Sequence, residues 1–215
     1  MPYRRTENVV RRLAARRDSI MQAAGALAAE AGINAVQITP VSQRAGIATG
    51  TVYRYFPSKT ELVAALVAAV SERELSAMRR AADAAPGPLS ALAAAITTFA
   101  ARALANPKLV FALIAEQADG AADEARLAFR EALATELGRL LSVAMKGSHL
   151  PDQNVAIAAP ALLGAVVEGL VGPLAAPADE ATARNTVQAI TLFALRAVGV
   201  ADARARGLVV QARMP

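Results

Sequence analysis

The residues best suited to contact another molecule gather between Thr49 and Lys59, in the run Thr-Gly-Thr-Val-Tyr-Arg-Tyr-Phe-Pro-Ser-Lys. The threonines and tyrosines of this run form hydrogen bonds, and Arg54 and Lys59 add positive charge. Val52 and Phe56 are four residues apart, so a helix places both on one face. A short polar helix on an apolar base, with cations beside it, is typical of a helix-turn-helix that enters the DNA major groove.

Start and stop signals bracket this short helix. Gly46 precedes it, and glycine adopts the left-handed backbone of a tight turn without steric cost. Pro57 ends it, and Ser58-Lys59-Thr60-Glu61 fits a capping box at the start of the next helix. Gln37 stands where a Ser or Thr cap is expected, which leaves the start of the preceding helix, at 38–45, open. The segment therefore predicts two short helices joined by a turn, followed by a third.

The same segment resembles the signature of a known family. Ala-Gly-Ile-x-x-Gly-Thr-Val-Tyr-x-Tyr-Phe-Pro-Ser-Lys-x-x-Leu, from Ala45 to Leu62, is similar to that of the TetR-type bacterial transcriptional regulators, and the match runs from about Ile20 to Leu66. The resemblance implies a DNA-reading head of three helices and a body of about six. It also implies DNA contacts by Thr51, Tyr53 and Lys59, with Thr49 and Tyr55 at specificity-setting positions.

The candidate DNA contacts share hydrogen-bonding capacity, positive charge or, for glycine, a backbone that can approach the duplex closely. They are Thr39, Arg44, Thr49, Gly50, Thr51, Tyr53, Arg54, Tyr55 and Lys59. Other interpretations stay open: Thr49 can be a helix cap, Tyr53 and Tyr55 can be packing aromatics, and Arg54 can be a solvated surface charge.

Positive charge is concentrated at the N-terminus. Residues 1–60 carry 9 Lys and Arg against 3 acids, whereas residues 61–215 carry 14 against 15, so the whole net charge of +5 rests on the first quarter. Such asymmetry indicates contact with a polyanion. The arginines of the N-terminal arm either enter a minor groove or add non-specific affinity.

The composition favours a helical, non-enzymatic protein. The chain has 215 residues, is 55% hydrophobic and rich in alanine, and contains no cysteine and one histidine. Without cysteine, a His-x-x-x-His pair or a glycine-rich phosphate loop, we expect no enzyme activity, no metal and no cofactor. No signal peptide is visible, and apolar stretches are interrupted before about 18 residues, so we expect a cytoplasmic protein without a membrane span.

Helical periodicity and breakers predict an all-α fold of about nine helices, and suggest three regions. We expect a DNA-binding head with its basic arm at 1–58, an effector-binding and dimerisation domain at 59–200, and a flexible basic tail at 201–215. The predicted helices lie at 12–31, 38–45, 49–56, 59–82, 89–105, 108–117, 124–145, 153–174 and 179–198.

One head reads too few base pairs for specificity, so regulators of this type bind near-palindromic operators in double-stranded DNA as homodimers. Small and apolar residues on the last two predicted helices suit a four-helix dimer interface, or else pack within one chain. The interface candidates are Leu162, Ala165, Val166, Gly169, Leu170, Ile190, Phe193, Ala194 and Ala197.

The body is larger than dimerisation requires, and the resemblance implies an effector pocket in it. Its candidates, each of which can also be ordinary core, are Phe99, Arg102, Ala103, Phe111, Ile114, Gln117, Phe129, Leu133 and Met145. His149, in a Gly-Ser-His-Leu-Pro loop, reads as a surface residue. The expected function is a repressor released by a small hydrophobic effector. An effector-dependent activator and a ligand-independent architectural DNA-binding protein are the alternatives.

Overall fold

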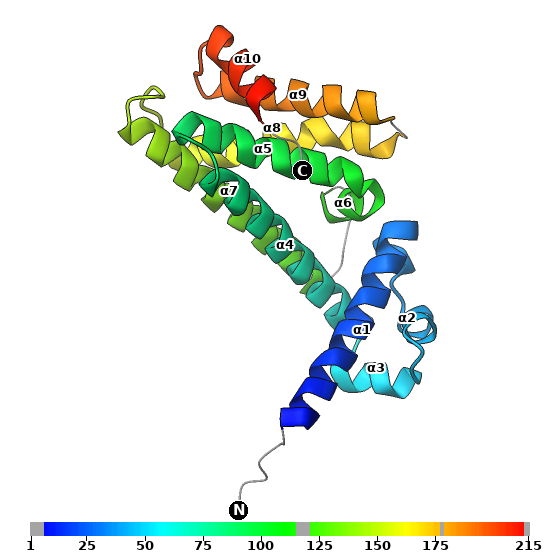
Figure 1. Ribbon diagram of the computed structural model, residues 1–215. Coiled ribbons are helices and arrows are strands. Elements are labelled where there is room, and N and C mark those ends of the chain that lie inside the picture. The colour runs from blue at the N-terminus through cyan, green and yellow to red at the C-terminus, as the bar shows by residue number, and fades with distance from the viewer. Residues whose placement is uncertain (1–6, 115–120, 177–178, 213–215) are drawn as a thin grey trace, which may run out of the picture.

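The computed structural model describes residues 7–114, 121–176 and 179–212, and within these ranges it is helical without strands. The all-α expectation is therefore confirmed. The elements, shown in Figure 1, are α1 (Glu7–Ala31), a 3-10 turn η1 (Ile33–Ala35), α2 (Ile38–Arg44), α3 (Thr49–Tyr55), α4 (Lys59–Asp83), α5 (Pro88–Ala105), α6 (Pro107–Ile114), α7 (Ala121–Lys146), α8 (Val155–Ala175), α9 (Glu180–Ala197) and α10 (Asp202–Gln211).

Helices α1 to α3 form one end of the molecule (Figure 1) around an apolar cluster. This cluster contains apolar side chains of all three helices, including the predicted inward pair Val52 and Phe56, and of the first turns of α4. Its fully enclosed members include Ile20, Val41, Val52 and Leu62, each with 0% of its surface exposed. Gly46 turns the chain between α2 and α3 with φ of 64°, as its position predicted.

The start signals of α2 and α4 differ. The amide of Glu61 donates to Ser58 Oγ at 3.1 Å, so the predicted cap of α4 is present. Helix α2 begins at Ile38 without a side-chain cap, because Gln37 has no cap hydrogen bond and supplies only its backbone carbonyl to Val41. Tertiary packing of Ile38 and Val41 takes the place of the missing cap.

The body consists of a long pair, α4 and α7, below a layer of α5, α8, α9 and α10 (Figure 1). Helix α4 leaves the head and runs beside α7 to the turn before α5, so it spans both parts of the molecule. The body core is built from large apolar side chains of these helices, with Leu92, Ile96, Leu141, Leu170 and Leu195 at 0–1% exposure.

The C-terminal residues correct the sequence-based expectation of a flexible tail. Residues Asp202–Gln211 form a tenth helix in the described chain, with Ala205 and Leu208 buried against the body. Gly199, at φ of 94°, redirects the chain so that this face meets α9 and α5. The apolar spacing of Ala205 and Leu208 was masked by the surrounding arginines.

The apolar runs of α5 and α8 are interrupted before about 18 residues, by Arg102 and Glu168 respectively, as expected. Both helices are long and apolar enough, by length and composition, to cross a membrane. Helix α8 continues through Pro160 and Pro173, both of which lie within the predicted helix at 153–174. The most apolar window of α5 is 56% buried, as in a core helix, whereas that of α8 is only 33% buried. Most residues of α8 are therefore only partly buried or exposed within this chain.

Candidate nucleic-acid interface

Helix α3 has an apolar inner face and a polar outer face. Val52 and Phe56 are buried at 0% and 4% exposure, whereas Tyr53 is 50% exposed and Gly50 and Arg54 are also exposed. The outer face lies at the end of the molecule remote from α5 and α10 (Figure 1). A rigid helix with its polar groups turned outward has the geometry needed to enter a major groove.

Two of the candidate residues on α3, Thr49 and Tyr55, also make contacts within the head. Thr49 Oγ1 lies 3.1 Å from the Oγ of buried Ser42 and shares a hydrogen bond with it. Ala48, not Thr49, is the N-cap of α3, so Thr49 joins α2 to α3 and does not cap the helix. Tyr55 packs against the apolar cluster of the head and is half-buried. Its ring therefore has the packing role that the sequence left open.

Arg44 has an intramolecular partner that the sequence did not reveal. Its two terminal nitrogens donate to the two carboxylate oxygens of Glu30, both at 2.7 Å. Because of this hydrogen bond the pKa of Glu30 is lowered and the pKa of Arg44 is raised. Lys108, from α6, donates to the backbone carbonyl of Glu30 at 2.6 Å. Arg44 thus links α2 to α1 through Glu30. To make its predicted phosphate contact, Arg44 must divide its hydrogen bonds between Glu30 and the phosphate.

A cationic groove of about 340 Å³ lies between the N-terminal half of α1 and α3. Its charges are Arg12 and Arg16 of α1, four residues apart on one helix face, and Arg54 of α3. The other lining residues are Val9, Leu13, Thr51 and Tyr55. Three guanidinium groups around one groove suit a phosphate backbone.

Arg12 and Arg16 were not among the candidate contacts, although the predicted helix at 12–31 contains both. Helix α1 begins at Glu7, five residues before the predicted start. Their i, i+4 spacing was the available signal. Nearby, the Arg17 guanidinium lies 5.3 Å from the centre of the Phe56 ring, which ties α1 to the end of α3.

The remaining DNA-contact candidates occupy compatible positions. Thr39 is exposed on α2, Thr51 is half-buried beside the cationic groove, and Lys59 is the first residue of α4, directly after α3. Together with Gly50, Tyr53 and Arg54 they lie on or beside the two helix-turn-helix helices. Their contacts with DNA stay predictions.

The effector-pocket candidates are mainly packed core. Phe99, Ala103, Phe129 and Leu133 are at most 4% exposed in the body core, with Phe111, Ile114 and Met145 packed against it. Gln117 lies outside the described residues. Met145 and Phe129 are separated by about 24 Å along α7, so one small cavity does not contain both.

Arg102, the charged candidate in that set, is already paired. Its Nε and Nη2 atoms donate to the Glu74 carboxylate at 2.6 and 2.9 Å, and this hydrogen bond raises the pKa of Arg102. The pair joins α5 to α4. Among the described residues, no group of three or more His, Cys, Asp or Glu side chains is arranged to hold a metal ion.

Four of the dimer candidates are corrected by the structure. Leu162, Val166 and Leu170, and on α9 Ala194, are at most 3% exposed inside a single chain, so they are not available to a second one. The leucines and valine repeat every four residues and form the stripe that faces the chain's own core.

The other dimer candidates are at least partly accessible. Phe193 is 59% exposed, Gly169 and Ala197 are exposed, and Ala165 and Ile190 are half-buried. Ile157 of α8, which was not a candidate, is 66% exposed. The accessible surface thus lies on the two predicted helices, but on a different face of α8.

Comparison with known proteins agrees with this geometry. Residues 20–66 match the model of the bacterial regulatory proteins of the tetR family. The HTH-type transcriptional repressor KstR of Rhodococcus jostii (strain RHA1) is 48% identical over 58 residues, which are 27% of each chain. The matched region therefore spans about a quarter of that relative.

Solved structures resemble the chain over most of its length. RolR in complex with resorcinol has a TM-score of 0.71 at 21% identity, covering 96% of this chain and 98% of that one. FadR of Bacillus subtilis in complex with stearoyl-CoA has a TM-score of 0.67 at 17% identity, covering 81% and 97%. At such identity these structures show a shared fold.

Residues 20–66 thus match the DNA-binding head of the TetR family, and the resemblance predicted from the sequence is confirmed. That family consists of DNA-binding regulators and not of enzymes, in agreement with the prediction.

Proposed function

We propose that this chain, whose residues 20–66 match the TetR-family DNA-binding head, is a cytoplasmic transcriptional repressor that binds a palindromic operator as a homodimer and is released by a small molecule. In this proposal the residues up to 58 read DNA, and residues 59–200 bind the effector and form the dimer. The repressor role is favoured over that of an activator or architectural protein because the similar curated relative is a repressor.

The observation that carries the proposal is that α3 has a buried apolar face and an exposed polar face, and lies beside a cationic groove. Tyr53, Gly50 and Arg54 face outward from a helix whose inner face is closed, and Arg12 and Arg16 add charge next to it. The outward groups of α3 can read base edges. Arg12 and Arg16 can bind DNA phosphates and hold the DNA backbone in register.

The dimer is supported by the surface of α8. Two thirds of its most apolar window is not buried by this chain, and Ile157 and Phe193, on α8 and α9, are exposed. Exposed apolar side chains on two helices suit a protein–protein interface, and a second copy would cover them by a two-fold arrangement. Gly164 and Gly169 on α8 would let the two chains approach closely.

The effector is supported by the solved relatives in fold. RolR binds resorcinol and the FadR of Bacillus subtilis binds stearoyl-CoA, so helical bodies of this architecture accept ligands from a small phenol to a long acyl thioester. We extend to this chain only the class: a small, largely hydrophobic compound. An effector that binds one arrangement of the two heads better than the other shifts the operator affinity by its coupling energy, typically about 1–3 kcal/mol.

The first test is selection of binding sites from random double-stranded DNA by the parent chain, with Thr51→Ala and Tyr53→Ala as variants. We expect the parent to enrich two inverted half-sites and both variants to lose that enrichment. Lys146→Ala is the control, because it removes one exposed charge at the far end of α7. If the parent binds DNA only in a salt-sensitive manner without a preferred sequence, the architectural alternative replaces the repressor.

A further inference from the structure

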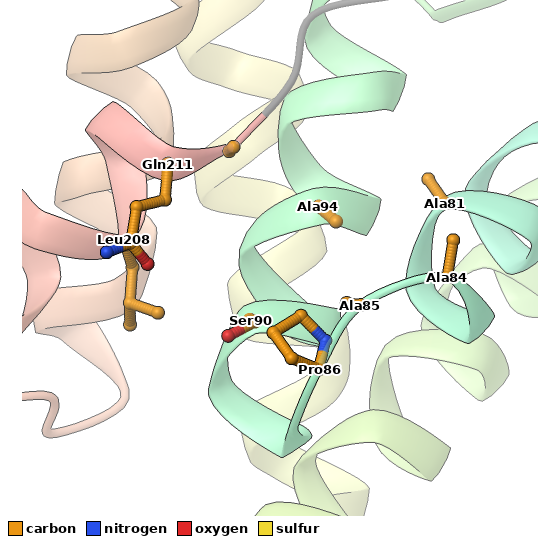
Figure 2. A pocket seen from close by; sticks show the side chains of 9 residues that line it. Ala81, Ala84, Ala85, Pro86, Ser90, Ala94, Leu208 and Gln211 are labelled. Atoms are coloured by element: carbon orange, nitrogen blue, oxygen red, sulfur yellow. The ribbon is translucent and has the colours of Figure 1, made fainter.

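A groove of about 510 Å³ lies between the end of α4, the start of α5 and α10, far from the DNA-reading head. In Figure 2, Leu208 and Gln211 of α10 line one side, Ala81 and Ala84 of α4 the other, and the first turns of α5 lie between them. The described residues that line it are Ala81, Ala84, Ala85, Pro86, Ser90, Ala94, Leu208, Gln211 and Ala212. None of these residues was a candidate for the predicted effector pocket.

The groove is hollow because its walls carry small side chains. Five of the nine lining residues are alanine, and the α10 face that packs on α9 and α5 contributes only Ala205 and Leu208 as buried side chains. The side chains of α10 and α4 that line this space are therefore too few and too small to fill it. Its volume falls within the range of about 300–1,000 Å³ that is typical of small-molecule sites.

The lining also defines a ligand chemistry. The alanine methyl groups, the Pro86 ring and the Leu208 side chain are apolar, and none of the nine described lining residues carries a charge. A charged ligand would lose its hydration without gaining an ionic partner, which is costly. The polar side chains are Ser90 and Gln211, whose hydroxyl and carboxamide can each donate and accept a hydrogen bond.

These two polar groups belong to neighbouring helices, Ser90 to α5 and Gln211 to α10. In Figure 2 the Ser90 oxygen projects from α5 toward α10, where the Gln211 carboxamide lies beside Leu208. A molecule between the walls would place its polar atoms at this edge and its apolar part against the alanines of α4. This arrangement resembles ligand sites generally, in which a few polar groups orient a mainly apolar molecule.

We propose that this groove binds a small, neutral, mainly apolar molecule that carries one or two hydrogen-bonding groups, such as an aromatic amine or a phenol. The groove shares no residue with the set predicted to line the effector pocket. It touches the last turn of α4, whose 25 residues span about 37 Å from the head to this groove. Binding here does not require DNA binding, so its failure would leave the repressor proposal untouched.

The test compares two fluorescent probes with the same ring system. N-phenyl-1-naphthylamine is neutral and has one N–H, whereas 1-anilinonaphthalene-8-sulfonate adds a sulfonate. Each is titrated into the full chain and into Ala94→Leu, which places a larger side chain in the groove, and Ser90→Ala. Ala128→Leu is the control, because Ala128 is an exposed alanine on α7 outside the groove. Circular dichroism confirms that each variant is folded.

We expect the neutral probe to bind the parent and Ala128→Leu equally, and Ala94→Leu at least about 10-fold more weakly, a loss of about 1.4 kcal/mol. Ser90→Ala should weaken it by a smaller factor, and the groove should not take up the sulfonate probe. If the neutral probe binds Ala94→Leu as well as it binds the parent, or if Ala94→Leu weakens only the sulfonate probe, the proposal is wrong.

A second measurement introduces no large side chain into the groove and locates the probe directly. The chain has no cysteine, so Ala212→Cys creates a single alkylation site in the groove lining, and Ala128→Cys creates one outside it. Saturating N-phenyl-1-naphthylamine should slow alkylation by N-ethylmaleimide at position 212 and not at position 128. Equal rates with and without the probe at position 212 would overturn the proposal even if Ala94→Leu does not fold.

Discussion

Single side chains in the head divide into those that hold it together and those that remain available to DNA. Thr49 shares a hydrogen bond with Ser42, and Arg44 donates to Glu30. Both side chains therefore use some of their hydrogen-bonding groups inside the head. Tyr53 is half exposed and has no core role. We therefore expect substitution at Tyr53 to affect DNA binding with little effect on folding.

Tyr53→Ala should lower operator affinity by about 5- to 20-fold, the loss expected for one polar contact of about 1–2 kcal/mol. Tyr53→Phe separates the hydroxyl from the ring, and an equal loss in both variants would assign the effect to the hydroxyl. Fluorescence anisotropy with the selected operator measures the affinity. The free energy of unfolding, measured by thermal denaturation, should change by less than about 0.5 kcal/mol. A large loss of stability in Tyr53→Ala would instead make Tyr53 a packing residue.

In the body, one buried carboxylate joins two helices. Glu136 of α7 has a side chain only 4% exposed, and it accepts hydrogen bonds from Arg79 of α4 at 3.0 Å and from Arg139 at 2.6 Å. Burial raises the pKa of Glu136, but the hydrogen bonds from Arg139 and Arg79 outweigh burial, so its pKa is lowered from 4.5. The folded state therefore favours the ionised form.

Glu136→Gln should destabilise the protein by about 1–3 kcal/mol at pH 7, because both arginines lose their partner but remain half exposed. Since the folded pKa lies below the unfolded value, the contribution is complete above pH 4.5 and is lost as pH falls through the folded pKa. The difference in unfolding free energy between parent and variant should thus shrink in acid. A difference that stays constant from pH 7 down to acid unfolding would show that the ionised carboxylate is not its source.

At the level of elements, α8 is strongly apolar, yet only a third of the residues in its most apolar window are buried. Leu162, Val166 and Leu170 face the chain's own core, which leaves Ile157 and Phe193 outward. A charge on this outer surface should oppose dimer formation without disturbing the core.

Phe193→Glu should therefore convert a dimer to a monomer and reduce operator affinity by at least about 100-fold, because each half-site would bind alone. Sedimentation velocity measures the assembly. Leu127→Glu is a matched control, since Leu127 is 62% exposed on α7 and Phe193 is 59% exposed on α9. Dimers that persist in Phe193→Glu and dissociate in Leu127→Glu would move the interface to α7.

Across the whole molecule, head and body share α6. Leu109 and Leu113 of this helix are buried in the apolar cluster of the head, whereas Val110 belongs to the body core. Lys108 adds a hydrogen bond to the end of α1. With α4 also running through both parts, we expect the chain to unfold as one cooperative unit.

Leu113→Ala tests this coupling. The substitution should cost about 2–5 kcal/mol, as for other buried leucines, and should loosen the head more than the body. Hydrogen exchange followed by mass spectrometry should show faster exchange in α1 to α3 than in α8 and α9. Val110→Ala, one turn away on the body side, should show the reverse, and identical exchange patterns for both variants would argue against separate roles for the two faces of α6.

The sequence alone determined the features that local patterns encode. The polar and apolar faces of α3, the Gly46 turn, the Ser58 cap and the signature around them specified the head, because each depends on neighbours within about one helical turn. The all-helical body was also determined locally, since alanine and periodic leucines favour helices wherever they pack.

Tertiary structure decided which faces of those helices meet. Helix α8 is apolar on all sides, so no polar stripe marked Leu162, Val166 and Leu170 as inward. The contact between Lys108 and Glu30 joins residues 78 positions apart, and the groove beside α10 depends on how three helices approach. Such contacts follow from packing of the complete chain, which periodicity in a short segment does not specify.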